Sequence, residues 1–370
     1  MALPLSTLAA AIMNTSGISH RLIDFCQALV GWMRGALAQV NVLSHMFFAE
    51  ISGSAVAGVA ATASIIMPAM KKRGYPGPFT AAVTSSTATL AIIIPPSIPM
   101  ILYAVMAGTS VVQMFVAGIV PGLLTAFGFM GLCYWYAVKH NWPVEQIFQW
   151  GKLWRAFKEA WAALTLPIII LGGIFGGVVT ATEGAALAVV AALFVGGVIY
   201  RELDWARLRE AIIDGAVQTG TVMLLVAASA LLGLYLTEVQ LPQRIAAAML
   251  SVTSEKWAIL AILNVFFLII GMFLHSAAAI VLVVPIVMPA VTAAGIDPVH
   301  FGVIVTLNLA IGQQTPPVAS VLLLTCSIAK ESVWDVTRAN LPFIGVLVAT
   351  LLLVTYVPVT TLGLVNFFYR

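Results

Sequence analysis

Two helix-breaking patterns recur in this chain at a constant spacing of 221 residues. No gap is needed to align the two copies, and both Pro-Pro pairs of the chain fall within the register. The matching positions are Met67-Pro68-Ala69 with Met288-Pro289-Ala290, Gly74 with Gly295, Pro95-Pro96 with Pro316-Pro317, and Pro121 with Pro342. In a membrane chain, proline-broken apolar segments at corresponding places in two halves indicate a binding site between those halves. The spacing therefore predicts a structural repeat that has diverged in sequence.

The composition indicates whether the chain folds in water or in a membrane. Hydrophobic residues make up 61% of the 370 residues and charged residues 8%, which excludes a soluble domain of this size. The apolar stretches are 78–107, 114–138, 162–181, 184–200, 215–236, 257–293, 299–329 and 340–366. Several exceed the roughly 20 residues that cross a bilayer, and the longest contain internal breaks. The sequence thus predicts an all-α polytopic membrane protein with some discontinuous spans.

The charged residues, cysteines and motifs exclude several other functions. The net charge of +3 comes from basic residues scattered among the loops, so no nucleic-acid-binding surface is expected. Three cysteines without paired spacing indicate neither a disulfide framework nor a metal centre. No nucleophile–base pair or metal motif of an enzyme is present. Two inverted, non-identical halves also lack the symmetric filter or charged rings of a passive channel. We therefore expect neither an enzyme nor a channel.

The distribution of basic residues predicts an orientation. Lys71-Lys72-Arg73 lies between two apolar stretches and is expected in the cytoplasm by the positive-inside rule. Counting crossings from there leaves only Arg244, Lys256 and Arg370 outside, among 17 lysines and arginines. The counterpart of the basic tip in the second half is Thr292-Ala293-Ala294, which carries no charge. The second half is therefore predicted to be inverted relative to the first.

Each half is predicted to contain three pieces in the same order. A re-entrant hairpin comes first, with its tip at Ser52-Gly53-Ser54 or at His275-Ser276-Ala277, because only a hairpin returns both ends to the side that the charge count requires. A span broken by the Pro-Pro pair follows, and an unbroken closing span ends the unit. The predicted divisions are an N-terminal helical segment (1–35), a first repeat (36–138), connecting scaffold helices (139–256) and a second inverted repeat (257–370).

A set of motifs spread along the chain resembles one known family. They are Phe47-Phe48-Ala49, Ile51-Ser52-Gly53-Ser54-Ala55-Val56-Ala57, Ile94-Pro95-Pro96-Ser97-Ile98-Pro99, Thr182-Glu183, Gly271-Met272-Phe273, Gly295-Ile296-Asp297-Pro298, Phe301-Gly302-Val303, Asn308-Leu309-Ala310-Ile311-Gly312 and Thr315-Pro316-Pro317. The sequence resembles the large membrane (M) subunit of tripartite ATP-independent periplasmic (TRAP) transporters. The resemblance runs from Pro4 to the C-terminus.

This resemblance implies an elevator-type, sodium-coupled secondary transporter of the bacterial inner membrane. It implies two partners, a small membrane (Q) subunit and a periplasmic substrate-binding protein, and an organic-acid substrate such as a sugar acid, a keto acid or a dicarboxylate. No cofactor is expected besides sodium ions. The first residue corresponds to a point well inside a typical large subunit, so about two fewer spans are expected. A stand-alone divalent-anion/sodium symporter of similar architecture and an inactive truncated copy remain as alternatives.

Neutral polar residues surround both breaks, whereas ionisable residues are rare in the apolar spans. A proton-driven carrier normally contains a relay of buried carboxylates or histidines, whereas neutral oxygens and unwound carbonyls suit a hard monovalent cation. The first candidate site for sodium or substrate contains Ser52, Gly53, Ser54, Thr87, Ile94, Pro95 and Ser97. The second contains His275, Ser276, Asn308, Gly312, Thr315 and Pro316. We expect these sites to bind Na⁺ and no transition metal.

The few ionisable residues need separate interpretations. Glu50 stands where the family usually has a small residue, and His275 stands where we expect a carboxylate. Glu183 ends the sequence Thr180-Ala181-Thr182-Glu183, which is typical of a capping box at the start of a helix. His45 is interpreted as an interior histidine whose ring nitrogens are paired.

Overall fold

The computed structural model describes residues 2–142, 144, 147–253 and 255–369, and this described part is helical with no strand. Its elements are α1 (Ala2–Thr15), α2 (Ile18–Val30), α3 (Ala36–Ser52), α4 (Ala55–Lys72), α5 (Gly77–Ala88), α6 (Leu90–Ile93), α7 (Ile98–Ala107), α8 (Val111–Lys139), α9 (Trp150–Phe175), α10 (Ala181–Phe194), the π-helical turn η1 (Val195–Ile199), α11 (Trp205–Glu238), α12 (Leu241–Val252), α13 (Lys256–Phe273), α14 (Ser276–Ala293), α15 (Pro298–Gly312), α16 (Ser320–Ala329), α17 (Val333–Tyr356) and α18 (Val359–Tyr369).

Eight spans in the described residues are long and apolar enough to cross a membrane. They are Gly77–Ala107, Val111–Lys139, Trp150–Phe175, Ala181–Ile199, Trp205–Leu236, Lys256–Phe273, Ser276–Ala293 and Val333–Tyr356. A helix satisfies its own backbone hydrogen bonds, so it is the usual way for an apolar chain to cross lipid. The prediction of an all-α polytopic membrane protein is confirmed.

The helices of the two repeats begin at corresponding positions. Five pairs correspond, namely α3 with α13, α4 with α14, α5 with α15, α7 with α16, and α8 with α17. Within each pair, the 221-residue register relates the first residues to within one position. The sequence spacing thus predicts helix boundaries as well as proline positions.

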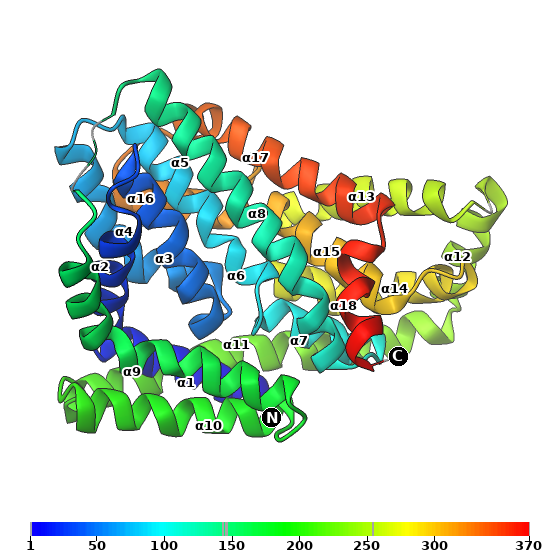
Figure 1. The fold of residues 1–370 in the computed structure, drawn as a ribbon. Helices are drawn as coiled ribbons and strands as arrows, with labels where there is room; N and C mark the ends of the chain where they lie inside the picture. Colours follow the sequence, from blue (N-terminus) through cyan, green and yellow to red (C-terminus); the bar gives the residue numbers. More distant parts are fainter. Residues whose placement is uncertain (1, 143, 145–146, 254, 370) are drawn as a thin grey trace.

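The two repeats exchange contacts across the centre of the molecule. The hairpin helix α4 of the first repeat packs against α16 of the second, and α14 of the second packs against α7 of the first. Likewise α5 contacts α17 and α15 contacts α8. In Figure 1 the α3–α4 hairpin (blue) lies on one side and the α13–α14 hairpin (yellow) lies on the other. The exchanged contacts make a single core from two similar units.

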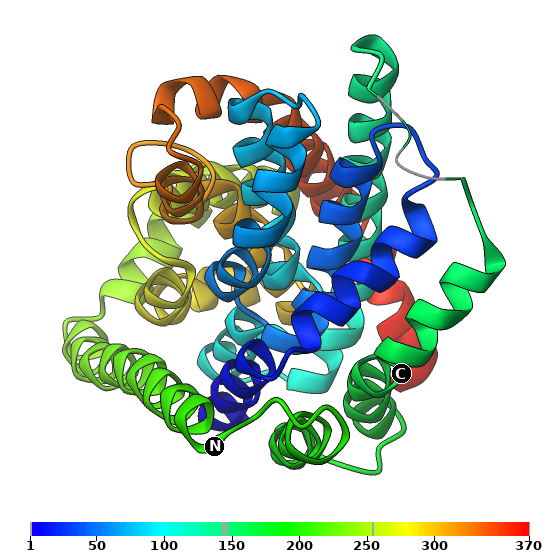
Figure 2. The same cartoon turned by 90° about the vertical axis from the view of Figure 1, so that its left-hand side faces the viewer.

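Helices α1, α2, α9, α10 and α11 form an outer layer on one side of this core, whereas α12 packs against α14. The first helix, α1, contacts both α10 and α11, while α2 packs against α9. Figure 2 shows these green helices arranged around the dark-blue start of the chain. Helix α11 is the longest element, with 34 residues, and it contacts α14 of the second repeat. The outer layer therefore touches the core close to a hairpin.

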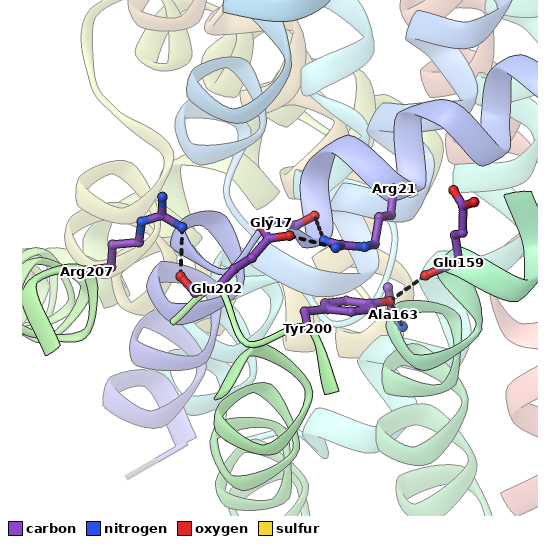
Figure 3. Close-up of polar contacts among 7 residues, drawn as sticks. All are labelled: Gly17, Arg21, Glu159, Ala163, Tyr200, Glu202 and Arg207. Atoms are coloured by element: carbon purple, nitrogen blue, oxygen red, sulfur yellow. Dashed lines mark hydrogen bonds and ion pairs between the residues drawn. The ribbon is translucent and has the colours of Figure 1, made fainter. Parts of the chain in front are cut away.

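A polar cluster ties the outer helices together at one end (Figure 3). The Arg21 guanidinium forms an ion pair with Glu202 at 2.6 Å and lies 3.9 Å above the ring centre of Tyr200. The Tyr200 hydroxyl donates to the Glu159 carbonyl in α9 at 3.0 Å, and burial raises the pKa of this phenol. Arg207 donates to the Glu202 carbonyl. The cluster links α2, α9 and the start of α11.

Two spans differ from their predicted bounds. The closing span predicted over 340–366 is divided into α17 and α18, because Pro358 lacks an amide hydrogen and follows the end of α17 at Tyr356. The span predicted over 162–181 begins earlier, at Trp150, and ends at Phe175 as α9. The predicted capping box is confirmed, since Thr180 and Glu183 pair reciprocally at the start of α10.

Candidate functional site

Each hairpin tip contacts the break of the following span through its backbone. The Ile98 amide donates to the Gly53 carbonyl at 3.2 Å in the first half. The Val318 amide donates to the Met272 carbonyl at the same distance in the second half. Both donors follow a Pro-Pro pair, and neither proline can donate a backbone hydrogen bond. The prolines therefore end one helix, and an amide within two residues of each Pro-Pro pair holds the hairpin.

The first tip requires glycine at position 53 for two reasons, its backbone conformation and the lack of room for a side chain. Its φ is 58°, in the left-handed region that glycine adopts without strain. A Cβ atom at this position would lie 2.7 Å from the Pro96 carbonyl oxygen. The tip backbone and the Pro-Pro break therefore approach each other as closely as the chain allows.

The two helices that leave the hairpin tips are capped by side chains in equivalent positions. Ser54 accepts a hydrogen bond from the Ala57 amide at the start of α4. His275, exactly one repeat later in the register, accepts from the Ala277 amide through Nδ1 at the start of α14. Each helix has 18 residues, and its amino end carries a partial positive charge. Two such ends face the centre of the protein.

A cavity of about 340 Å³ separates the two hairpin tips. It is lined by Thr7, Gly53, Ser54, Ala55, Val56, Ile92, Ile98, Pro99, Gln218, Thr221, Val222, Leu225, His275, Ser276, Ala277 and Gln313. Helices α1 and α11 of the outer layer close one side of it. None of the lining residues is a lysine, an arginine or a carboxylate. Any charge placed here meets helix ends, amides, hydroxyls and one imidazole.

The cavity unites four of the predicted site residues. Gly53 and Ser54 from the first hairpin line it together with His275 and Ser276 from the second. The sequence predicted two sites, one in each half. The structure brings the tips of both to one central space, and the side chain of Ser52 lies outside the described part of the structure.

The other residues of the first predicted site lie behind the tip. Ile94 follows α6 as its C-cap, and Pro95 comes next. Ser97 caps α7 and donates to the Ile92 carbonyl at 2.8 Å. Thr87 is buried in α5, where its hydroxyl lies 3.0 Å from His45 Nδ1. The His45 ring also contacts the Asn41 carbonyl and the Thr62 hydroxyl. Both of its nitrogens are paired, as its interior position predicted.

The second predicted site contains an unpaired oxygen. Asn308, the counterpart of Thr87, donates to Asn264 at 2.7 Å and to the Ile304 carbonyl at 2.9 Å. Its own Oδ1 is buried without a hydrogen-bond partner. Thr315 follows α15 and donates to the Ile311 carbonyl, and Pro316 begins the Pro-Pro pair. Gly312 packs directly on the Gly271 backbone, so a Cβ atom there would overlap it.

A fully buried polar network joins the two halves near the breaks. Gln314 donates to the Ser85 carbonyl at 2.8 Å, and its side-chain oxygen accepts from the Ser85 hydroxyl and from Asn340. Ser86 donates to the Asn340 side chain. All four residues have 0% exposure. Because each buried partner satisfies another, disturbing one leaves several groups unpaired.

Three polar cavity residues from outside the tips were not among the predicted sites. Thr7, Gln218 and Thr221 lie on α1 and α11, which carry no break that would mark them in the sequence. Gln313 lies beside the second break, and its position in the repeat register was the one available signal. Within the described residues, no group of three histidines, cysteines, aspartates or glutamates is placed to hold a metal ion.

Comparisons with known proteins identify the family. Residues 1–360 match the family model described as the tripartite ATP-independent periplasmic transporter, DctM component. The isethionate TRAP transporter permease protein DctMQ of Oleidesulfovibrio alaskensis is 40% identical over 97% of this chain, which spans 56% of that protein's length. The C4-dicarboxylate TRAP transporter large permease protein DctM of Vibrio cholerae is 38% identical over 97% of this chain and 83% of its own length.

One further relative agrees with this assignment, and one solved structure shows a similar fold. The 2,3-diketo-L-gulonate TRAP transporter large permease protein YiaN of Escherichia coli is 37% identical over 97% of this chain and 84% of its own length. The YdaH transporter of Alcanivorax borkumensis has a similar fold, with a TM-score of 0.66 at 15% identity over 96% of this chain and 85% of that one. These relatives are named as transporter proteins and not as enzymes. The chain therefore belongs to the DctM component family of tripartite ATP-independent periplasmic transporters and is a multi-pass protein of the inner membrane.

Proposed function

We propose that this chain is the membrane-embedded permease of a sodium-coupled, binding-protein-dependent importer of small organic acids. Its relatives are named for isethionate, C4-dicarboxylates, 2,3-diketo-L-gulonate and sialic acid. All of these are small organic anions. The family membership supports the large-subunit role, and a small membrane (Q) subunit and a periplasmic substrate-binding protein are the proposed partners.

The central cavity is the observation that carries this proposal. The amino ends of α4 and α14 meet there, and helix amino ends stabilise negative charge through their free amides and their dipoles. The absence of lysine and arginine among its lining residues favours weak, reversible binding of an anion. A carrier needs such binding, because its substrate must leave as readily as it enters.

Sodium coupling is proposed from the neutral oxygens behind each tip. In the second half, the buried Oδ1 of Asn308 has no protein donor, and an unpaired buried acceptor is unfavourable until a cation or a water satisfies it. In the first half, the proposed ligands are the oxygens at Gly53, Ser54, Ile94 and Ser97. Carbonyls at broken helices are known ligands for sodium in transporters of this general design.

An elevator movement would carry the two repeats past the outer helices. The repeats share exchanged contacts and a buried polar network, which favour movement as one body. The outer helices are tied by the Arg21–Glu202–Tyr200 cluster. On this proposal, α1 and α11 form one wall of the cavity and stay fixed, while the hairpin tips move with the substrate.

Reconstituted vesicles test coupling and partners together. Uptake of radiolabelled malate and isethionate is measured against sodium concentration at fixed pH, then against pH at fixed sodium. We expect uptake only with an inward sodium gradient and only with both partners present. Uptake by the chain alone at the full rate would support the stand-alone symporter instead. Uptake that persists without sodium and follows the proton gradient would contradict sodium coupling.

A further inference from the structure

The cavity has the same positions on its two sides but different chemistry. The first repeat contributes Ser54, Ala55, Val56 and Ile92, and the second contributes the positions 221 residues later in the sequence. Those later residues are His275, Ser276, Ala277 and Gln313. In this register the Ser54 hydroxyl corresponds to the His275 imidazole, the Ala55 methyl group to the Ser276 hydroxyl, and the Ile92 side chain to the Gln313 carboxamide. At these four positions the repeat places corresponding backbone sites along the cavity, but their side chains differ in chemistry.

Gln313 is the least satisfied polar residue on this cavity wall. It is 2% exposed, and neither its amide nitrogen nor its amide oxygen has a hydrogen-bond partner. Leaving a hydrogen-bonding group buried without a partner is unfavourable. Its counterpart Ile92 fills the same place in the first repeat at no such cost. The Gln313 amide is therefore available to form hydrogen bonds with a ligand in the cavity.

His275 supplies a hydrogen-bond donor on the same wall. Its Nδ1 accepts from the Ala277 amide, so in the neutral ring the hydrogen resides on Nε2. Nε2–H is then a donor on an exposed side chain that lines the cavity. With the amide of Gln313 and the hydroxyl of Ser276, this wall offers two donors, an acceptor and a hydroxyl. On the opposite wall, the Ser54 oxygen already caps α4, and the side chains of Ala55, Val56 and Ile92 are apolar.

We infer that Gln313 selects a hydroxylated organic anion, whose hydroxyl and acidic group meet the second-repeat wall. The amide NH₂ donates to an acidic-group oxygen, while the amide oxygen accepts the hydroxyl hydrogen of the same ligand. The carbon skeleton lies against the apolar side chains of the first-repeat wall, Val56 and Ile92. This inference rests on the proposed function and narrows its substrate class from organic acids to hydroxy acids, with carboxylates and sulfonates sharing the required chemistry.

Matched pairs of probes test the inference by binding to the purified full chain in sodium and in choline. The pairs differ by one hydroxyl: malate against succinate, glycolate against acetate, and isethionate against ethanesulfonate. For at least one pair, we expect sodium-dependent binding at least about tenfold tighter for the hydroxylated member, because a buried amide left unpaired by the other member disfavours it.

Two variants of Gln313 distinguish a role in selecting the substrate from a purely structural role. Gln313→Leu should reduce the hydroxyl preference to about twofold or less, while thermal stability without ligand stays the same or rises, since a buried unpaired amide is removed. Gln313→Glu keeps the size and the acceptor oxygens of the side chain but adds a negative charge. It should therefore weaken the binding of both members of each pair. Ile93→Leu, in the same helix as Ile92 but outside the cavity lining, is the control and should leave the preference unchanged.

Each outcome has a distinct meaning. Equal sodium-dependent affinity for both members of every pair in the unmodified protein would overturn the inference but leave the proposed function standing. A hydroxyl preference that survives Gln313→Leu would overturn the role of Gln313. Absence of sodium-dependent binding for all six probes would overturn the inference and the proposed function together.

Discussion

The first and second repeats place their closest backbone approaches at different positions. In the first repeat, the hairpin tip requires Gly53, whereas its counterpart Leu274 has an extended backbone and bears a full side chain. In the second repeat, the close approach joins Gly271 to Gly312, and their counterparts are Glu50 and Ala91. The repeated fold determines that tip and break must touch. It leaves open which of them supplies the glycine.

The polar residues behind the tips differ in the same way. Thr87 in the first repeat belongs to a satisfied group around His45, whereas its counterpart Asn308 leaves one oxygen unpaired. If each repeat binds a sodium ion, the two ions will have unlike ligands. Substitutions at mirror positions can therefore distinguish what the shared fold requires from what each repeat does separately.

Gly312→Val should have the largest effect. The new side chain would overlap the Gly271 backbone, and backbone cannot rotate aside as a side chain can, so we expect a loss of about 3 kcal/mol or more. The measurement is the free energy of unfolding in detergent. The mirror change Ala91→Gly should cost about 1 kcal/mol or less. Similar losses of unfolding free energy for Gly312→Val and Ala91→Gly would show that the close backbone approach at Gly312 is not a special requirement of the second repeat.

Gly53→Val should abolish sodium-dependent uptake in protein that still inserts and folds. It places a β-branched residue at a positive φ and within reach of the Pro96 carbonyl, a strain of about 1–3 kcal/mol that is confined to the tip. Uptake in vesicles is compared with the amount of folded protein recovered. Leu274→Val at the mirror position should retain uptake. Normal coupling in Gly53→Val would show that this tip does not approach the ion.

Asn340→Leu should lower stability by an intermediate amount. It removes the acceptor for Ser86 and one donor to Gln314, so we expect a loss of about 1–3 kcal/mol in the free energy of unfolding. A double-mutant cycle with Ser86→Ala measures the coupling between the repeats. Ile119→Leu, at the mirror position of Asn340, is the control. Additive effects of the two changes would show that the network does not act as a unit.

Thr315→Val should have the smallest effect. It removes one hydroxyl at nearly constant volume, and that hydroxyl already donates to the Ile311 carbonyl. We expect the sodium concentration for half-maximal uptake to rise about threefold to tenfold, equivalent to about 1 kcal/mol. The mirror residue Ile94 has no hydroxyl, so Ile94→Val should leave the sodium dependence unchanged. Equal shifts for both would argue against a ligand role for the Thr315 hydroxyl.

Much of the fold was predictable because prolines and small residues act locally. The hairpin tips, the two breaks and the Glu183 cap follow from backbone constraints that a few neighbouring residues impose. The break at Pro358 was missed, because the apolar run continues through it and hydropathy alone gives no boundary. The start of α9 at Trp150 was missed because charged residues such as Lys152 and Arg155 lie before the apolar run, and hydropathy alone does not show that the helix includes them.

The cavity was less predictable because it is made by contacts between distant segments. The sequence placed one site in each half and did not show that Ser54 and His275 line the same space. Gln218 and Thr221 come from an unbroken helix that carries no local signal. Gln313 and Gln314 are adjacent in sequence, yet one is unpaired at the cavity and the other is the centre of a network. Only the packing separates their roles.

The network around Gln314 also shows whether one repeat could take the place of the other. One repeat length away from Ser85 and Ser86 are Thr306 and Leu307, and the counterparts of Gln314 and Asn340 are Ile93 and Ile119. A pair of first repeats would lack both amides, and a pair of second repeats would lack the Ser86 hydroxyl. Neither half can therefore assemble with a copy of itself and keep these bonds. Each half therefore depends on the other half, and not on a copy of itself, to complete this network.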